Sequence, residues 1–210
     1  MEKRFWAIIG VIIAIFVGIL LFSSDKENKK ADTPKGQPTS HIKGKKDSGV
    51  KLIEYSDFQC PFCGQYYPIV EQVTEKYKDQ ISFQYRHYPL SQLHKNAVSA
   101  ARASEAAGEQ GKFWEMYGIL FQNQQSWSDS NNVRTVFEGY AEQLGLDTKK
   151  FKTDFASSET NDRINADRKE FTKTGFQEST PTFILNGKRI QPASLEEFSK
   201  LIEEALKKQD

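Results

Sequence analysis

The chain is poor in cysteine and histidine: its 210 residues include only two cysteines and three histidines. The histidines, His41, His87 and His94, are not paired at the spacing of metal ligands, so the sequence offers no recognisable four-ligand zinc site. The net charge is only +1, which argues against a nucleic-acid-binding protein, because that class is usually strongly basic. We therefore expect no metal, no cofactor and no nucleic-acid partner.

One long apolar run is present, from Phe5 to Phe22. As a helix its length would be about 27 Å, close to the thickness of the hydrocarbon core of a bilayer. Lys3 and Arg4 precede the run, which predicts that residues 1–22 anchor the chain with its N-terminus in the cytoplasm and the rest outside. A cleaved signal peptide and a buried core helix are alternatives that the sequence leaves open.

A polar segment follows the run. Residues 23–48 contain seven lysines and four acidic residues, together with serine, threonine, proline and glycine, and almost no apolar side chains. Such a segment cannot bury enough surface to fold. We therefore expect a flexible tether over 23–48 and a folded domain that begins at residue 49.

The first part of the folded region has the pattern of a strand, a helix and a second strand. Residues 50–55 and 81–85 have the composition of strands, and helical spacing of apolar residues follows Cys63. Helical spacing then continues from His94 to about Thr174, and its first part is rich in alanine. This order predicts a helical block after the second strand.

The C-terminal part returns to strands. Asn186-Gly187 lies between two short β-like runs and is a preferred dipeptide for the type I′ turn of a hairpin. Ser194, with Glu197 three residues later, is a capping box that predicts the start of a last helix. The chain is therefore expected to end in a hairpin and a helix.

The two cysteines, Cys60 and Cys63, are separated by only two residues, at the predicted junction of a strand and a helix. A disulfide between them would close a very small loop and stabilise the fold little, so redox chemistry explains the spacing better. The helix N-terminus favours a thiolate on Cys60, and Pro61 suits the first helical turn because it lacks an amide hydrogen. Residue Gly64 excludes a haem-attachment motif, which requires histidine there. A zinc site or an inert buried pair is a weaker alternative.

Four stretches of this sequence resemble the DsbA-type branch of the thioredoxin superfamily. They are Glu54-Tyr55-Ser56-Asp57-Phe58-Gln59-Cys60-Pro61-Phe62-Cys63, Tyr85-Arg86-His87-Tyr88-Pro89-Leu90, the alanine-rich helix with Lys112-Phe113-Trp114, and Ser179-Thr180-Pro181-Thr182-Phe183. The resemblance implies an α/β, thioredoxin-like fold. Its thioredoxin-like lobe would comprise residues 49–92 and 176–210, with an inserted helical domain at 93–175.

The resemblance also implies roles for single residues. Cys60 would be the nucleophile and Cys63 the resolving thiol. Pro181 would be cis and face the disulfide, and the backbone of Thr180 would pair with an extended substrate. Glu54 would be a buried acid that helps protons move near Cys63.

The residues alone leave two of these roles open. Glu54 could be a surface acid on a strand edge, and Pro181 could be trans, as most prolines are. Pro61 and Phe62, between the cysteines, are expected to contact substrate. The strongest oxidants of the family have histidine where this chain has Phe62, which cannot donate a hydrogen bond to a thiolate.

These features predict an enzyme that exchanges thiols and disulfides outside the cytoplasm and introduces disulfides into secreted proteins. Its partners would be reduced or unfolded secreted proteins and a membrane protein that reoxidises the cysteine pair. The alternatives are a reductase or isomerase that uses the same site, and a non-catalytic binding or assembly factor with the same fold.

Overall fold

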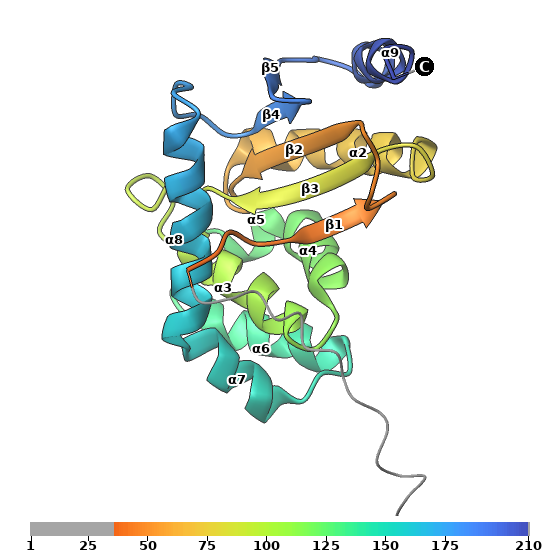
Figure 1. Ribbon diagram of the computed structural model, residues 1–210. Helices are drawn as coiled ribbons and strands as arrows, with labels where there is room; N and C mark the ends of the chain where they lie inside the picture. Colours follow the sequence, from red (N-terminus) through yellow and green to blue (C-terminus); the bar gives the residue numbers. More distant parts are fainter. Residues whose placement is uncertain (1–35, 210) are drawn as a thin grey trace, which may run out of the picture. The chain divides into compact units, whose positions relative to one another are not determined.

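The computed structural model describes residues 36–209, and its central element is a five-stranded sheet with the strand order β1-β3-β2-β4-β5 (Figure 1). The strands are β1 (His41–Gly44), β2 (Lys51–Ser56), β3 (Ser82–His87), β4 (Thr182–Leu185) and β5 (Lys188–Ile190). Strands β2 and β3 pair in parallel, and the other neighbours pair antiparallel. The parallel pair requires a crossover, which helix α2 (Pro61–Lys76) supplies.

Helices α2 and α9 (Leu195–Leu206) pack together with one face of the sheet. Apolar side chains of both helices share a core with alternate residues of the strands, because successive side chains of a strand point to opposite faces. This core contains Leu52, Val70, Val73, Phe83, Phe183, Leu185, Phe198 and Ile202. Side chains from the other strand positions, such as Tyr55 and Ile184, pack with Phe171 in a separate cluster.

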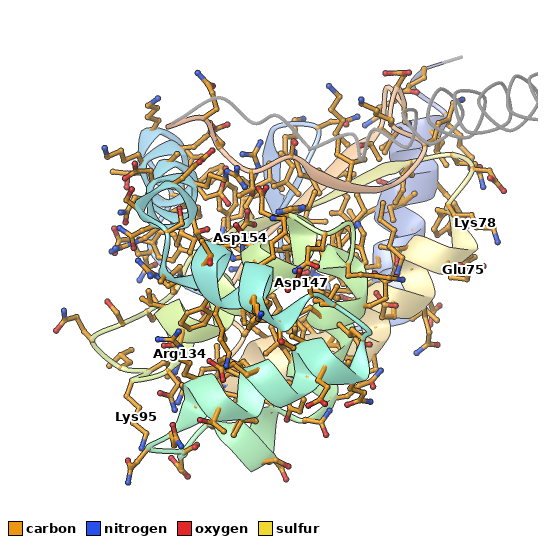
Figure 2. All side chains as sticks on the ribbon, turned by 90° about the horizontal axis from the view of Figure 1, so that it is seen from below. Glu75, Lys78, Lys95, Arg134, Asp147 and Asp154 are labelled. Carbon is orange, nitrogen blue, oxygen red and sulfur yellow. The ribbon has the colours of Figure 1, made fainter. Side chains whose placement is uncertain are left out.

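The chain between β3 and β4 is helical, as the sequence predicts. The helices are α3 (Ala97–Gly108), α4 (Phe113–Gln122), α5 (Gln124–Trp127), α6 (Val133–Gln143), α7 (Thr148–Ala156) and α8 (Ser158–Lys173). Alanines of α3 are buried in the cluster that joins the helices, where their small size allows close approach. Figure 2 labels Asp154 on α7 and Asp147 directly before it, and the Asp147 carboxylate caps this helix by accepting from the amides of Lys149 and Lys150.

The two predicted C-terminal signals act locally as expected. Asn186 and Gly187 have positive φ angles of 47° and 80°, which the type I′ turn between β4 and β5 requires. The Ser194 hydroxyl accepts a hydrogen bond from the amide of Glu197 and caps α9. The hairpin and the last helix are therefore confirmed.

The predicted tether is wrong in its C-terminal part. Strand β1 lies inside residues 23–48 and pairs with β3, and Thr39 and Ser48 are buried. The amide and hydroxyl of Thr39 donate to the buried Asp167 carboxylate at 2.8 and 2.6 Å. This edge strand has only four residues, two of them with polar side chains, so it shows no apolar periodicity by which composition could reveal it.

The predicted membrane anchor, residues 1–22, lies outside the described residues, as do residues 23–35 of the predicted tether. Among residues 36–209, no helix has both the length and the apolar character needed to cross a bilayer.

Candidate active site

The Cys60 side chain lies at the point where the chain enters helix α2. Residue 60 is the N-cap, with extended φ and ψ angles of −66° and 123°, and Pro61 is the first helical residue. Cys63 is one turn further on and is fully buried, whereas Cys60 retains 4% exposure. Both side chains are free thiols. The strand-to-helix placement predicted from the sequence is therefore present.

The two thiols have opposite proton affinities. A hydrogen bond from the Cys63 thiol lowers the pKa of Cys60 to about 6; burial acts against this, while Thr180 and the amides of Phe62 and Cys63 support it. Burial, followed by the nearby Cys60 sulfur, raises the pKa of Cys63. A sulfur that is deprotonated near neutral pH is the better nucleophile, so the geometry favours attack at Cys60.

A second loop meets the cysteines. The Thr180–Pro181 bond is cis, the isomer that the family resemblance implies. The carbonyl oxygen of Thr180 lies 3.5 Å from the Cys60 sulfur. Strand β4 begins at the next residue, Thr182, and its pairing with β2 fixes this loop against the end of the strand that leads to Cys60.

Glu54 is buried in the middle of the sheet, so a surface position is excluded. It lies on β2 with 1% exposure, and burial raises its pKa to about 8, while a hydrogen bond with Ser56 acts in the opposite direction. Its charge in turn raises the pKa of Cys63. A carboxyl group that titrates near neutral pH and senses Cys63 can accept or supply a proton there.

Comparison with known proteins decides the family. A family model described as thioredoxin matches residues 36–204. The chain belongs to the thioredoxin family. Within this family its fold is that of the DsbA type, with an α/β sheet and an inserted helical domain, so the predicted fold class is confirmed.

Two solved structures illustrate this likeness. BdbD from Bacillus subtilis, in its oxidised form, superposes with a TM-score of 0.71 at 23% identity, over 82% of this chain and 97% of that one. α-DsbA1 from Wolbachia pipientis gives a TM-score of 0.69 at 20% identity, over 82% and 94% of the two chains.

Curated sequence relatives are much longer proteins. A Na(+)/H(+) antiporter, NhaA 3 from Salinispora tropica, is 36% identical over 160 residues, which are 76% of this chain and 24% of that protein. The thioredoxin-family chain thus spans about a quarter of the relatives it matches, and their antiporter name describes the longer proteins.

Two large apolar side chains near the cysteines are exposed. Phe62 is 64% exposed and Leu93 is 77% exposed, and no other large apolar side chain within residues 36–209 is as open. Leu93 and Pro61 line a cavity of about 880 Å³ whose other walls are mostly amide and hydroxyl side chains. The exposure of Phe62 fits its predicted contact with substrate, whereas Leu93 carried no signal in the sequence.

Asp57 organises the loop before Cys60, which the sequence did not reveal. Its buried carboxylate accepts from the amide of Gln59 at 2.7 Å, from the amide of Leu90 at 2.9 Å and from His94 Nδ1 at 2.7 Å. The loop that carries Cys60 is therefore tied to the segment between β3 and α3. A single acidic residue before the cysteines gave no sign of these partners.

The other two histidines meet around Glu105, a carboxylate buried on α3. Nε2 of His41 and of His87 lie 2.5 and 2.8 Å from the same oxygen, and Arg163 approaches the second oxygen at 3.6 Å. Although burial acts to raise it, the pKa of Glu105 is lowered because both histidines face it. These residues could offer nitrogen and oxygen ligands to a metal, but ligands of a tetrahedral zinc ion lie about 3.3 Å apart. The distances from the two histidine nitrogens to the Glu105 oxygen are those of hydrogen bonds. These bonds join β1 and β3 to α3.

Proposed function

We propose that this chain is a protein thiol–disulfide oxidoreductase in which Cys60 exchanges disulfides with client proteins and Cys63 resolves the mixed disulfide. The observation that carries the proposal is the contrast between the two thiols, with a pKa of about 6 for Cys60 and a raised pKa for Cys63. The neighbouring Thr180 carbonyl supports it, because an extended client could pair with that backbone.

The reaction begins with the disulfide between Cys60 and Cys63. A client thiolate attacks the Cys60 sulfur, the bond between the two cysteines breaks, and Cys63 leaves as a thiolate that takes up a proton. Glu54, with its pKa of about 8, is a suitable proton donor for this step. A second client thiolate then attacks the client sulfur of the mixed disulfide, and Cys60 leaves as a stabilised thiolate. In the opposite sense, Cys63 resolves the mixed disulfide by attacking the Cys60 sulfur, which releases the client as a thiolate. The client loses two electrons and two thiol protons, which the cysteine pair and the solvent accept.

The favoured direction is oxidation of the client. Stabilising the Cys60 thiolate stabilises the reduced enzyme, and this makes the disulfide form a stronger oxidant. Phe62 adds no hydrogen-bond donor, so the stabilisation rests on the Cys63 thiol, on Thr180 and on backbone amides. A membrane redox partner that accepts the two electrons would return the pair to the disulfide state.

The setting we propose is the outer side of the cell membrane. It rests on the apolar run from Phe5 to Phe22 with Lys3 and Arg4 before it. Clients would then be reduced or unfolded secreted proteins, in a compartment where disulfides persist. Added protease should digest residues 36–209 on intact cells, and protection of that region would contradict this location.

Three assays on the full chain in detergent separate the alternatives. An oxidase should restore activity to reduced, unfolded ribonuclease, and it should do so better than it reduces insulin. A reductase should show the reverse preference, and an isomerase should act chiefly on scrambled ribonuclease. A binding factor should show none of these activities beyond those of the Cys60→Ser variant.

A further inference from the structure

We propose that Gln124, on the short helix α5, is a positioning residue for the redox site, and that it acts by holding the backbone on both sides of Cys60. This inference rests on the proposed thiol–disulfide exchange. It assigns to the inserted helical segment a direct part in tuning the cysteine.

The contact is made by one side-chain amide and two carbonyl groups. Nε2 of Gln124 donates to the carbonyl oxygen of Phe58 at 2.7 Å and to the carbonyl oxygen of Cys60 at 2.9 Å. The amide group has two N–H bonds, so both can be used at once. The carbonyl of Cys60 also accepts from the amide of Gly64 at 3.1 Å, in the first turn of α2. Gln124 therefore holds the loop where it becomes the helix.

Gly64 is matched to this contact. A Cβ atom added at Gly64 would lie 2.5 Å from Oε1 of Gln124, far inside the normal contact distance. Gly64 has no positive φ angle that would require glycine, so the constraint on this position comes from the Gln124 side chain, which a larger residue would displace. The residue after the second cysteine and a residue on α5 thus form a close-fitting pair.

Gln124 is itself held by a rigid neighbour. Trp127, on the same helix, is fully buried and donates from its ring nitrogen to the carbonyl of Leu120 at 2.8 Å. Asn96 Nδ2 donates to the carbonyls of Trp127 and Ser128 at 3.3 and 3.0 Å. The amide of Gln124 consequently meets the cysteine loop from a fixed position.

A second tie from the same region supports this interpretation. Gln59, directly before Cys60, donates from Nε2 to the carbonyl of Ser128 at 2.9 Å and accepts from the amide of Asn96 at 2.7 Å. The loop is thus bound to the end of α5 from its own side chain as well as through its carbonyls. Moving α5 would disturb the backbone around Cys60.

The expected electrostatic effect has a definite sign. Each carbonyl oxygen carries partial negative charge, which disfavours a thiolate nearby, and a donated N–H offsets that charge. The contact also keeps the first turn of α2 in the geometry in which the amides of Phe62 and Cys63 lower the pKa of Cys60. Without the Gln124 amide, the pKa of Cys60 should rise and the disulfide should become a weaker oxidant.

The main test compares Gln124→Met with Gln125→Met in the full chain in detergent. Gln125 is the exposed neighbour on the same helix and forms no hydrogen bond with the cysteine loop within the described residues. The pKa of Cys60 is measured from the ultraviolet absorbance of its thiolate, and the redox equilibrium is measured against glutathione. We expect Gln124→Met to shift the redox equilibrium roughly tenfold, which is about 30 mV, with a higher Cys60 pKa. Gln125→Met should match the parent protein.

Gln124→Glu keeps the shape but replaces the donor with a negative charge, so it should raise the Cys60 pKa further than Gln124→Met does. If Gln124→Met fails to fold, Gln124→Glu provides the same test of the Cys60 pKa. Unchanged Cys60 pKa values in the folded Gln124 variants, alongside a low value in the parent, would overturn the inference and leave the proposed function intact. An ordinary Cys60 pKa in the parent protein would instead count against the proposed function.

The pairing with Gly64 gives an independent check. Gly64→Ala alone should raise the pKa of Cys60, because the new methyl group displaces the Gln124 side chain. In a Gln124→Ala background the same substitution should add little. Strictly additive effects of Gly64→Ala and Gln124→Ala on the pKa would show that the two residues do not act together, against the inference.

Discussion

The sulfur of Cys60 lies 3.5 Å from the carbonyl oxygen of Thr180, although 120 residues separate them in the sequence. This contact joins the two halves of the site: the start of α2, with its low-pKa thiol, and the loop that leads into β4. The Cys60 loop follows β2 and the Thr180 loop leads into β4. Because these two strands are neighbours in the sheet, their pairing fixes the separation of the two loops. A client bound along Thr180 would therefore present its sulfur to Cys60.

The two cysteines should be distinguishable by trapping. Cys63→Ser removes the resolving thiol, so a Cys60 thiolate that attacks a client disulfide should stay joined to one client sulfur while the other leaves as a thiolate, and mixed disulfides should accumulate. Cys60→Ser should accumulate none, because Cys63 is fully buried and its pKa is raised. Non-reducing electrophoresis after acid quenching measures both variants. Trapping by Cys60→Ser alone would reverse the assigned roles.

Stability of the reduced protein should depend on pH through Cys60. Its pKa is about 6 when folded, against about 8.5 for a free thiol, so its stabilising contribution is fully present above pH 8.5 and is lost as pH falls through 6. The oxidised protein has no such thiol. The denaturant midpoint of the reduced form, relative to that of the oxidised form, should rise between pH 6 and pH 8. A flat difference across this range would argue against a low-pKa Cys60.

Glu54 should lower the stability of the fold at neutral and alkaline pH. Its folded pKa of about 8 exceeds the usual value, so its favourable contribution is present at pH 4 and is lost as pH rises through 8. Glu54→Gln in the oxidised protein should therefore be more stable than the parent at pH 8, on the order of a few kcal/mol, with a gap that closes towards pH 4.

Glu75→Gln is the matched control for this substitution, because Glu75 is an exposed acid of α2 that pairs with Lys78 (Figure 2). It should show no comparable gain. Equal responses of the two variants to pH would mean that the Glu54 carboxyl is not the group responsible. The Glu54→Gln variant should also slow client oxidation, if Glu54 supplies the proton to Cys63.

The exposed apolar side chains beside the cysteines should matter for protein clients and not for small thiols. Leu93→Ser removes a side chain that is 77% exposed, so the fold should tolerate it. Partial burial of this leucine against a client is worth about 1 kcal/mol, which predicts a roughly fivefold slower oxidation of reduced ribonuclease. Oxidation of dithiothreitol by the same variant is the internal control and should be unchanged. Equal slowing of both reactions would indicate damage to the redox site itself.

Several parts of the fold could be predicted because their signals are local. The Asn186-Gly187 turn, the Ser194 cap and the helix that begins at Pro61 each depend on residue types within a few positions. The strand-to-helix junction located Cys60 and Cys63 for the same reason. The cis bond before Pro181 was predicted from the family resemblance, because no local feature of the sequence indicates it.

Most of the contacts that were missed are long-range. Strand β1 is four residues long, with two polar side chains, and its stability comes from backbone pairing with β3 and from the bond between Thr39 and Asp167. Composition therefore assigns His41 to the tether and does not predict its contact with Glu105. Gln124 belongs to no motif and to no periodic pattern of apolar residues, so the sequence does not single it out. Only the folded structure brings its amide to the carbonyl of Cys60.

The reduction potential of the Cys60–Cys63 pair, measured by equilibration of the full chain with glutathione buffers, tests the central claim most directly. A Cys60 pKa of about 6 stabilises the reduced form, so the potential should lie well above thioredoxin's value of about −270 mV. Because Phe62 donates no hydrogen bond, it should stay below the value of about −120 mV that characterises the strongest oxidants. A potential at or below that of thioredoxin would contradict the oxidase assignment and favour a reductase.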